Sequence, residues 1–107
     1  MSSSDFYCDE VLSGRTRVDV ISETANVIAL NHTKPSYPIH IVVIPKKHIP
    51  SLTTADDEDW SAVVETLQVV RDVARDIEVE HGKCSIITNL GQYQESKHLH
   101  WHIVVRE

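Results

Sequence analysis

Three histidines alternate with two large apolar residues in the run from His98 to His102. Successive side chains of a β-strand point to opposite faces of a sheet. A strand here therefore places His98, His100 and His102 on one face, and three apolar residues on the other, toward a core: Leu99, Trp101 and Ile103. Three groups that titrate near neutral pH on one rigid surface suit nucleophilic attack, proton transfer or metal ligation better than packing. The run predicts a final strand over 98–105 that carries a functional site.

A second segment predicts one long amphipathic helix. From Trp60 to Ile77 the apolar residues recur with the 3.6-residue period of a helix face. Thr53 or Thr54 is expected to cap the N-terminus, and the acidic residues 56–59 to lie in the first turn, at the positive end of the helix dipole. Gly82 is expected to end the helix.

Short β-favouring runs surround this helix. Residues 18–22 and 26–30 predict a hairpin, 40–44 a buried strand closed by a proline, and 84–89 a fourth strand. A short helix is expected over 6–13, capped by Ser4 or Asp5 and stopped by Gly14. Together these elements predict an α+β domain, a five-stranded antiparallel meander with one long amphipathic helix across it.

Composition narrows the class of protein. A chain of 107 residues is expected to form a single domain over 1–107. Ten basic residues against sixteen acidic ones, a net charge of −6, argue against a general nucleic-acid binder, which needs a surplus of Lys and Arg. Two cysteines in unrelated contexts, no basic-then-apolar signal and no apolar run of membrane-spanning length lead us to expect a cytoplasmic protein without membrane contact.

The order of motifs resembles the histidine triad (HIT) family of nucleotide hydrolases and transferases. The resemblance rests on His98-x-His100-x-His102 followed by Ile103-Val104-Val105, on Asn89 nine residues earlier, and on Ile41-Val42-Val43-Ile44-Pro45-Lys46-Lys47-His48. The segments 8–14 and 27–30 also match the family, so the resemblance extends over nearly the whole chain. It implies the HIT-like fold, with a short N-terminal helix.

The resemblance also implies a mechanism. His100 would attack the α-phosphorus of a nucleoside monophosphate conjugate, such as a phosphoramidate or a dinucleoside polyphosphate, and form a covalent phosphoramidate that water hydrolyses. His102 and His40 would contact the phosphate and orient the nucleophile, and His98 would lie on the leaving-group side. Close imidazoles disfavour one another's charge, so the cluster is expected to hold fewer protons than independent histidines. Neither a metal nor a cofactor is implied.

Substrate contacts follow from the same resemblance. Asn89 and Gln94 would offer amides to the phosphoryl or ribose region. Glu95 stands where the family often has a serine, and its carboxylate is expected to repel an anionic leaving group and to accept a hydrogen bond from an amine. The sugar site of the family carries Asp-x-x-Pro, whereas this chain has His32 there, preceded by Asn31. Neutral His32 is expected to accept one hydrogen bond in place of a bidentate carboxylate.

Other interpretations stand beside this one. The same fold would serve a nucleotide-binding regulatory protein with little turnover, and three histidines on one sheet face suit a metal ion with an open position. Cys8, His48 and His98 match positions where some relatives bind structural zinc, but Asp5 replaces the fourth ligand, and Cys8 as a small buried hydrophobe is the preferred interpretation. By resemblance, we expect a purine nucleotide substrate and a homodimer formed through the long helix and a sheet edge.

Overall fold

The computed structural model describes residues 7–14 and 17–107, and the account below concerns these residues. Eight elements follow one another along the chain: a π-helical turn η1 (Tyr7–Leu12), β1 (Val20–Glu23), β2 (Val27–Asn31), β3 (Ile39–Pro45), α1 (Trp60–His81), β4 (Ser85–Ile87), a 3₁₀ turn η2 (Gly91–Tyr93) and β5 (Trp101–Val105). The expected cap at Ser4 or Asp5 lies outside the described residues, and Gly14 follows η1 with a positive φ of 83°.

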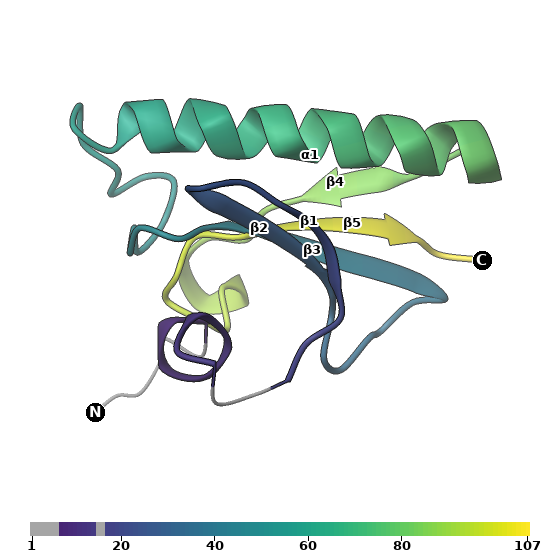
Figure 1. Ribbon diagram of the computed structural model, residues 1–107, viewed down its shortest axis with the longest axis horizontal. Coiled ribbons are helices and arrows are strands. Elements are labelled where there is room, and N and C mark those ends of the chain that lie inside the picture. The colour runs from purple at the N-terminus through teal and green to yellow at the C-terminus, as the bar shows by residue number, and fades with distance from the viewer. Residues whose placement is uncertain (1–6, 15–16) are drawn as a thin grey trace.

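The five strands form one antiparallel sheet in the order β1-β2-β3-β5-β4. Helix α1 covers one face of this sheet and η1 lies against the other (Figure 1). The α+β class, the five antiparallel strands and the single long helix are as predicted. A simple meander is wrong, because β4 follows α1 in sequence but pairs on the outer side of β5, so that β5 inserts between β3 and β4.

Helix α1 begins later than its sequence predicts. Asp59 is the N-cap residue, and the acidic residues expected in the first turn precede the helix instead. Asp56 and Asp59 close a turn of their own, in which each carboxylate accepts the other residue's backbone N–H at 3.2 and 3.1 Å. Thr54 caps a different turn, since its hydroxyl accepts the N–H of Ser51. The predicted end is confirmed: Gly82 has a φ of 80° and donates its N–H to Glu78 O at 2.7 Å.

The last strand also begins later than expected, at Trp101 rather than at His98. Upstream of it, the N–H of Leu99 donates to Ile49 O at 2.6 Å, and His98 Nε2 donates to Pro45 O at 2.7 Å. The segment 98–100 is therefore held by the end of β3 and the loop that follows. The predicted alternation persists through it, because Leu99 packs into the core under α1 whereas His100 lines a pocket.

Two apolar clusters lie on the two faces of the sheet. The larger packs α1 onto the sheet and includes Leu99, Trp101 and Ile103, the apolar partners predicted from the alternation. The smaller packs η1 onto the opposite face, through Tyr7 and Val11. Because η1 covers only part of that face, the rest of the face contributes to a pocket that His40, His100 and His102 line.

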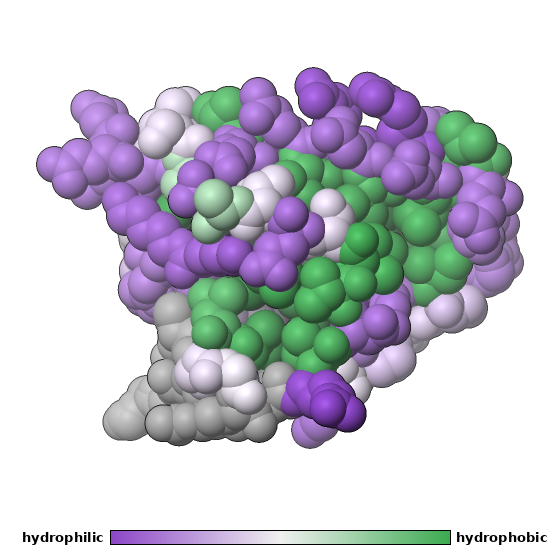
Figure 2. Space-filling model, in the orientation of Figure 1, coloured by the Kyte–Doolittle hydropathy of each residue, from purple (hydrophilic) through white to green (hydrophobic). Residues whose placement is uncertain are grey.

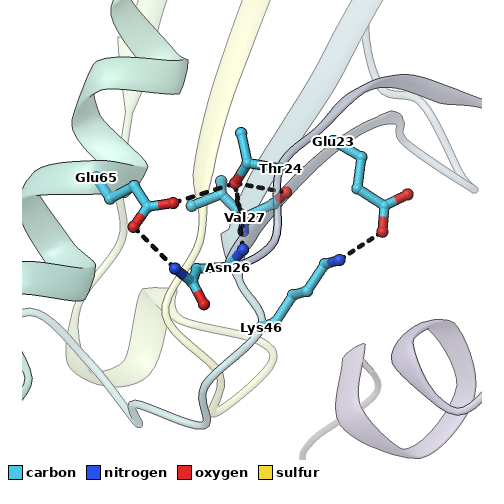
Figure 3. A network of polar contacts seen from close by, with 6 residues as sticks. All are labelled: Glu23, Thr24, Asn26, Val27, Lys46 and Glu65. Carbon is cyan, nitrogen blue, oxygen red and sulfur yellow. Dashed lines mark hydrogen bonds and ion pairs between the residues drawn. The ribbon is translucent and has the colours of Figure 1, made fainter.

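Polar contacts join the β1–β2 turn to α1. Glu65 of the helix accepts hydrogen bonds from the Thr24 hydroxyl at 3.2 Å and from Asn26 Nδ2 at 3.1 Å (Figure 3). Nearby, Lys46 forms an ion pair with Glu23.

On the side of the molecule seen in Figure 2, apolar side chains form a patch bordered by hydrophilic ones. Among the described residues, no helix has the length and apolar character needed to cross a membrane.

Candidate active site

The register of β3 and β5 brings two histidines together. His40 pairs with Val104, and His102 pairs with Val42, so that the two imidazoles are diagonal neighbours on the face opposite α1. His40 Nε2 and His102 Nδ1 lie 2.8 Å apart, a hydrogen-bond distance. The His100 ring is 4.9 Å from the His102 ring, nearly perpendicular to it.

These three imidazoles line one pocket of about 570 Å³. The pocket also receives side chains from the loop after β2, the segment after β4 and the turn η1. Its described lining comprises Tyr7, His32, Thr33, Lys34, Ser36, Tyr37, His40, Ile87, Asn89, Tyr93, Glu95, Ser96, His100 and His102.

One hydrogen bond fixes the tautomer of His100. Its Nδ1 lies 2.7 Å from the backbone oxygen of His98, and a carbonyl oxygen only accepts. Nδ1 therefore carries the proton, and Nε2 of the neutral ring holds the lone pair. Burial lowers the pKa of His100, which favours this neutral form. The Thr88 hydroxyl donates to His100 O at 2.8 Å and anchors the backbone of the same residue.

The tautomers of His40 and His102 follow from the loop beside them. The N–H of Ser36 donates to His40 Nδ1 at 3.0 Å, so this nitrogen is unprotonated. The proton of neutral His40 is then on Nε2, from which it is donated to His102 Nδ1. His102 in turn carries its proton on Nε2. A relay that begins at a backbone amide thus leaves His102 with a single N–H donor.

The environment keeps these rings uncharged at neutral pH. Burial, together with the neighbouring His32, lowers the pKa of His40 from 6.5 to about 4. Burial and the nearby His100, His40 and His32 lower the pKa of His102 to about 3. The lowered pKa values agree with the expectation that the cluster holds fewer protons than independent histidines.

His32 extends the row of imidazoles outward. Its ring stacks on His40, with centroids 4.3 Å apart and an interplanar angle of 25°. The N–H of Lys34 donates to His32 Nδ1 at 3.0 Å. The expectation that neutral His32 accepts a hydrogen bond from the ligand is therefore wrong, because its acceptor nitrogen is already occupied. The nitrogen that remains, Nε2, is a donor.

His98 departs from its predicted place on the leaving-group side. Its side chain is fully buried, its Nε2 donates to Pro45 O, and its ring lies 5.4 Å from that of His48. The ring joins the end of β3 to the segment before β5, and its backbone oxygen fixes the tautomer of His100. His98 is thus a positioning residue. Both rings lie against Tyr7, at 6.0 Å for His98 and 5.1 Å for His100, but His98 is fully buried there whereas His100 lines the pocket.

The four remaining predicted substrate contacts divide into two pairs. Asn89 and the exposed Glu95 line the pocket, as the resemblance led us to expect. Gln94 is buried and donates from Nε2 to Pro50 O at 2.6 Å, and Asn31 donates from Nδ2 to Asp19 at 2.8 Å. Both amides are occupied by the protein itself, and a role for them in substrate binding stays a prediction.

Several residues of the site were missed as site residues from the sequence. Tyr7 is buried, with its ring centroid 5.1 Å from that of His100. Burial and the charge of Glu95 raise the pKa of the Tyr7 phenol, which therefore keeps its proton. Ser36 acts through its backbone N–H and Thr88 through a hydroxyl aimed at a carbonyl. Neither role leaves a sequence signal. Any residue but proline has a backbone N–H, and the identity of a threonine does not say which carbonyl its hydroxyl contacts.

A metal ion is a poor match for the hydrogen bonds of this cluster. One ring nitrogen from each of His32, His40 and His102 lies within 4.8 Å of the others, which is a plausible spacing for ligands. However, a ligating imidazole donates its second N–H to a carbonyl or a carboxylate. Here the Nδ1 atoms of His32 and His40 accept from backbone amides instead. His32 and His102 therefore present N–H donors, which suit an anion, and both ring nitrogens of His40 are used within the protein. Of the positions that match the structural zinc ligands of some relatives, the side chains of Cys8 and Asp5 lie outside what the structure describes.

Comparison with known proteins places these observations in context. The family model of the HIT domain matches residues 14–107. An uncharacterized HIT-like protein of Chlamydia muridarum (strain MoPn / Nigg) is 32% identical over 97 residues, which cover 90% of this chain and 77% of that protein. A histidine triad protein from Clostridium difficile superposes with a TM-score of 0.82 at 29% identity, covering 100% of this chain and 94% of the other. A HIT family hydrolase from Legionella pneumophila Philadelphia 1 shares the fold, with a TM-score of 0.83 at 24% identity, covering 96% and 93%.

Proposed function

Because this chain belongs to the HIT domain family, we propose that it is a hydrolase that cleaves a nucleoside monophosphate conjugate at its α-phosphate, through a covalent His100 intermediate. The observation that carries the proposal is the hydrogen bond from His100 Nδ1 to His98 O. It leaves Nε2 of a neutral ring as the nucleophile, in a pocket where His32 and His102 present N–H donors.

In the first step the lone pair of His100 Nε2 forms a bond to the α-phosphorus, and the bond from phosphorus to the leaving group breaks. The leaving atom takes the electron pair, and where it is the nitrogen of an amine it takes a proton from solvent, which is returned when the water is deprotonated in the second step. The His100 ring, which keeps its proton on Nδ1, becomes positively charged, and the carbonyl oxygen of His98 stabilises that charge. The N–H of His102 is placed to donate to a phosphoryl oxygen, on which negative charge develops.

In the second step water attacks the phosphorus and the bond from phosphorus to Nε2 breaks. The electron pair returns to Nε2, the proton of the water passes to solvent, and a nucleoside monophosphate is released. Two displacements replace one difficult step. A neutral nucleophile is therefore restored without any change in the protonation of His40 or His102.

The covalent intermediate is the test of this proposal. Chelator-treated protein is mixed with adenosine or guanosine 5′-phosphoramidate or with a dinucleoside polyphosphate, and intact mass and nucleotide release are followed together. We expect a transient gain of one nucleotidyl group and release of monophosphate. Replacement His100→Ala should abolish the adduct and lower turnover by about a thousand-fold or more.

Three outcomes would contradict the proposal in different ways. A folded protein that binds nucleotide without adduct or release would be a binding protein of the same fold. Activity that returns only with added metal would assign the chemistry to a metal site. Turnover that persists in His100→Ala would place the nucleophile elsewhere.

Glu95 is proposed to favour an amine as the leaving group. Its exposed carboxylate lies in the same pocket lining as His100, where it stabilises a protonated nitrogen and repels a departing phosphate. Replacement Glu95→Ser should shift the ratio of kcat/KM values toward the dinucleoside polyphosphate, whereas Glu95→Gln, of equal size, reports the charge alone. An unchanged ratio in both variants would contradict this role.

We also propose that the protein pairs with a second copy through α1 and the edge strand β4. Between these elements runs a groove lined by Leu67, Val70, Ala74, Cys84 and Ile86. Leu67 of α1 and Ile86 of β4 are 42% and 50% exposed. Strand β4 lies at the edge of the sheet, so its outer side is available to pair with a strand of a second copy. Sedimentation equilibrium should give a dimer mass that Leu67→Glu reduces to that of the monomer. A monomeric wild-type protein at micromolar concentration would overturn this pairing.

A further inference from the structure

The pocket wall formed by residues 32–37 contains a cation, Lys34, that no acidic group in the described part of the chain neutralises. Four lysines in the described part of the chain have partners: Lys46 pairs with Glu23, Lys47 with Asp59, Lys83 with Glu107, and Lys97 with backbone oxygens. The exposed side chain of Lys34 has none within that part of the chain, although Lys34 lines the pocket. Its ammonium group is available to a ligand.

The same pocket wall carries a second donor, which has a fixed direction. His32 uses Nδ1 to accept the backbone N–H of Lys34, so Nε2 of the neutral ring carries the proton. The ring is held flat on His40 at 4.3 Å and also lies 5.8 Å from the His102 ring. The donor of His32 is therefore next to His102, the imidazole proposed to donate to the α-phosphate.

We propose that His32 and Lys34 form a subsite for a second phosphate group of the ligand, beside the α-phosphate. This inference rests on the proposed function, which assigns the α-phosphate to His100 and His102. A phosphate oxygen accepts both an N–H and an ammonium hydrogen bond, and each is stronger than a bond between neutral groups. The hydroxyl-bearing Thr33 and Ser36 of the same wall also donate to oxygen.

A pair of free sugar hydroxyls matches this wall less well. Vicinal hydroxyls are held best by a carboxylate, which accepts from both at once, and residues 31–39 contain neither Asp nor Glu. Glu95 is the carboxylate in the described lining of the pocket, and it comes from another segment. Burial lowers the pKa of His32 and keeps the ring neutral, although the charge of Glu95 acts in the opposite direction, so the ring retains the single Nε2–H donor.

The second phosphate has two chemical sources. It is either a phosphate ester on the sugar of the nucleotide or the β-phosphate on the leaving-group side. Calorimetric titration of the wild-type chain with AMP, ADP and adenosine 3′,5′-bisphosphate separates them. We expect one of the two bisphosphorylated ligands to bind about 5–10-fold more tightly than AMP at low salt, which corresponds to roughly 1 kcal/mol. Tighter ADP identifies the β-phosphate, and tighter 3′,5′-bisphosphate identifies the sugar phosphate.

Variants test whether His32 and Lys34 cause the gain in affinity over AMP. Lys34→Gln keeps the backbone N–H that orients His32, and it should lose most of the gain, measured as the affinity for each bisphosphorylated ligand relative to that for AMP in the same variant. His32→Asp should lose the gain and reverse it by repulsion. Lys83→Gln removes an exposed lysine outside the pocket and should keep the gain in full.

The subsite is overturned if neither ligand binds more tightly than AMP, or if the gain survives in both Lys34→Gln and His32→Asp. These results are independent of the covalent adduct on His100, which tests the proposed function. If the protein binds no nucleotide, the same titration with phosphate and pyrophosphate tests whether the subsite exists. Pyrophosphate should then bind more tightly, with the same dependence on Lys34, and equal affinities would reject the subsite.

Discussion

The two faces of the sheet are built from the same strands but by different chemistry. Toward α1, β5 sends Trp101 and Ile103 into a core from which water is excluded. Toward the pocket, the same segment sends His100 and His102 into a wall in which each ring nitrogen facing the protein has an assigned hydrogen-bond partner. One face is held together by apolar packing, and the other by directed hydrogen bonds from backbone groups.

This difference shows how the fold supports reactive groups. Burial lowers the pKa of the imidazoles, but burial alone does not choose which nitrogen holds the proton. The backbone oxygen of His98 and the amide of Ser36 make that choice for His100 and His40. Packing on the apolar face makes the sheet rigid, and hydrogen bonds on the polar face set the imidazole tautomers. Variants on the apolar face should therefore lower stability, whereas variants on the polar face should change how stability depends on pH.

The largest effect on stability is expected from the apolar face. Ile103→Ala removes a fully buried side chain beneath α1 and should lower the free energy of unfolding by about 2–5 kcal/mol, measured by urea denaturation. Its cross-strand partner Ile86 is 50% exposed, so Ile86→Ala should cost well under half as much. Equal costs at these two paired positions would break the contrast between core and edge.

The polar face should make stability depend on pH. The pKa values of His40 and His102 are about 4 and about 3 in the folded protein, below the ordinary value of 6.5. The unfolded chain therefore binds more protons between these values, and the free energy of unfolding should fall as the pH is lowered from about 6.5 toward 4. Urea denaturation across this range measures the slope.

A matched pair of variants sharpens this test. His40→Gln should make the slope shallower, whereas His81→Gln, at the exposed end of α1, should leave it nearly unchanged. Stability that stays constant or rises on acidification would show that the imidazoles are not held neutral.

The smallest effect on the free energy of unfolding is expected at the polar contact between α1 and the β1–β2 turn. Glu65→Ala removes hydrogen bonds to Thr24 and Asn26 at an exposed position and should cost about 1 kcal/mol or less. A double-mutant cycle with Asn26→Ala isolates the pairwise part. A loss larger than that of Ile103→Ala would mean that this contact, rather than the core, holds the helix on the sheet.

The sequence predicted the elements of the fold better than their limits. The alternation before Val104 correctly assigned Trp101 and Ile103 to the core, and the glycine at position 82 correctly marked the end of α1. The start of α1 was wrong because Asp56 and Asp59 bond to each other's backbone in a separate turn. The insertion of β5 between β3 and β4 depends on long-range pairing, which local pattern does not encode.

For the site, the sequence predicted which imidazoles meet but not how they are protonated. His40, His100 and His102 come together as the motif suggested, whereas His98 turns into the protein because Pro45 O accepts from its ring. The donor character of His32 depends on a backbone amide two residues away. Such contacts follow from loop geometry, which side-chain identity does not specify.

The most direct test of this account is the tautomer of His100 in the free protein. Two-dimensional ¹H–¹⁵N NMR correlation of the imidazole rings at neutral pH, assigned with His100→Ala, distinguishes a proton on Nδ1 from one on Nε2. The account predicts a neutral ring with the proton on Nδ1, donated to His98 O, and an unprotonated Nε2 facing the pocket. A proton on Nε2, or a doubly protonated ring, would contradict the assignment of His100 as a nucleophile prepared by its backbone.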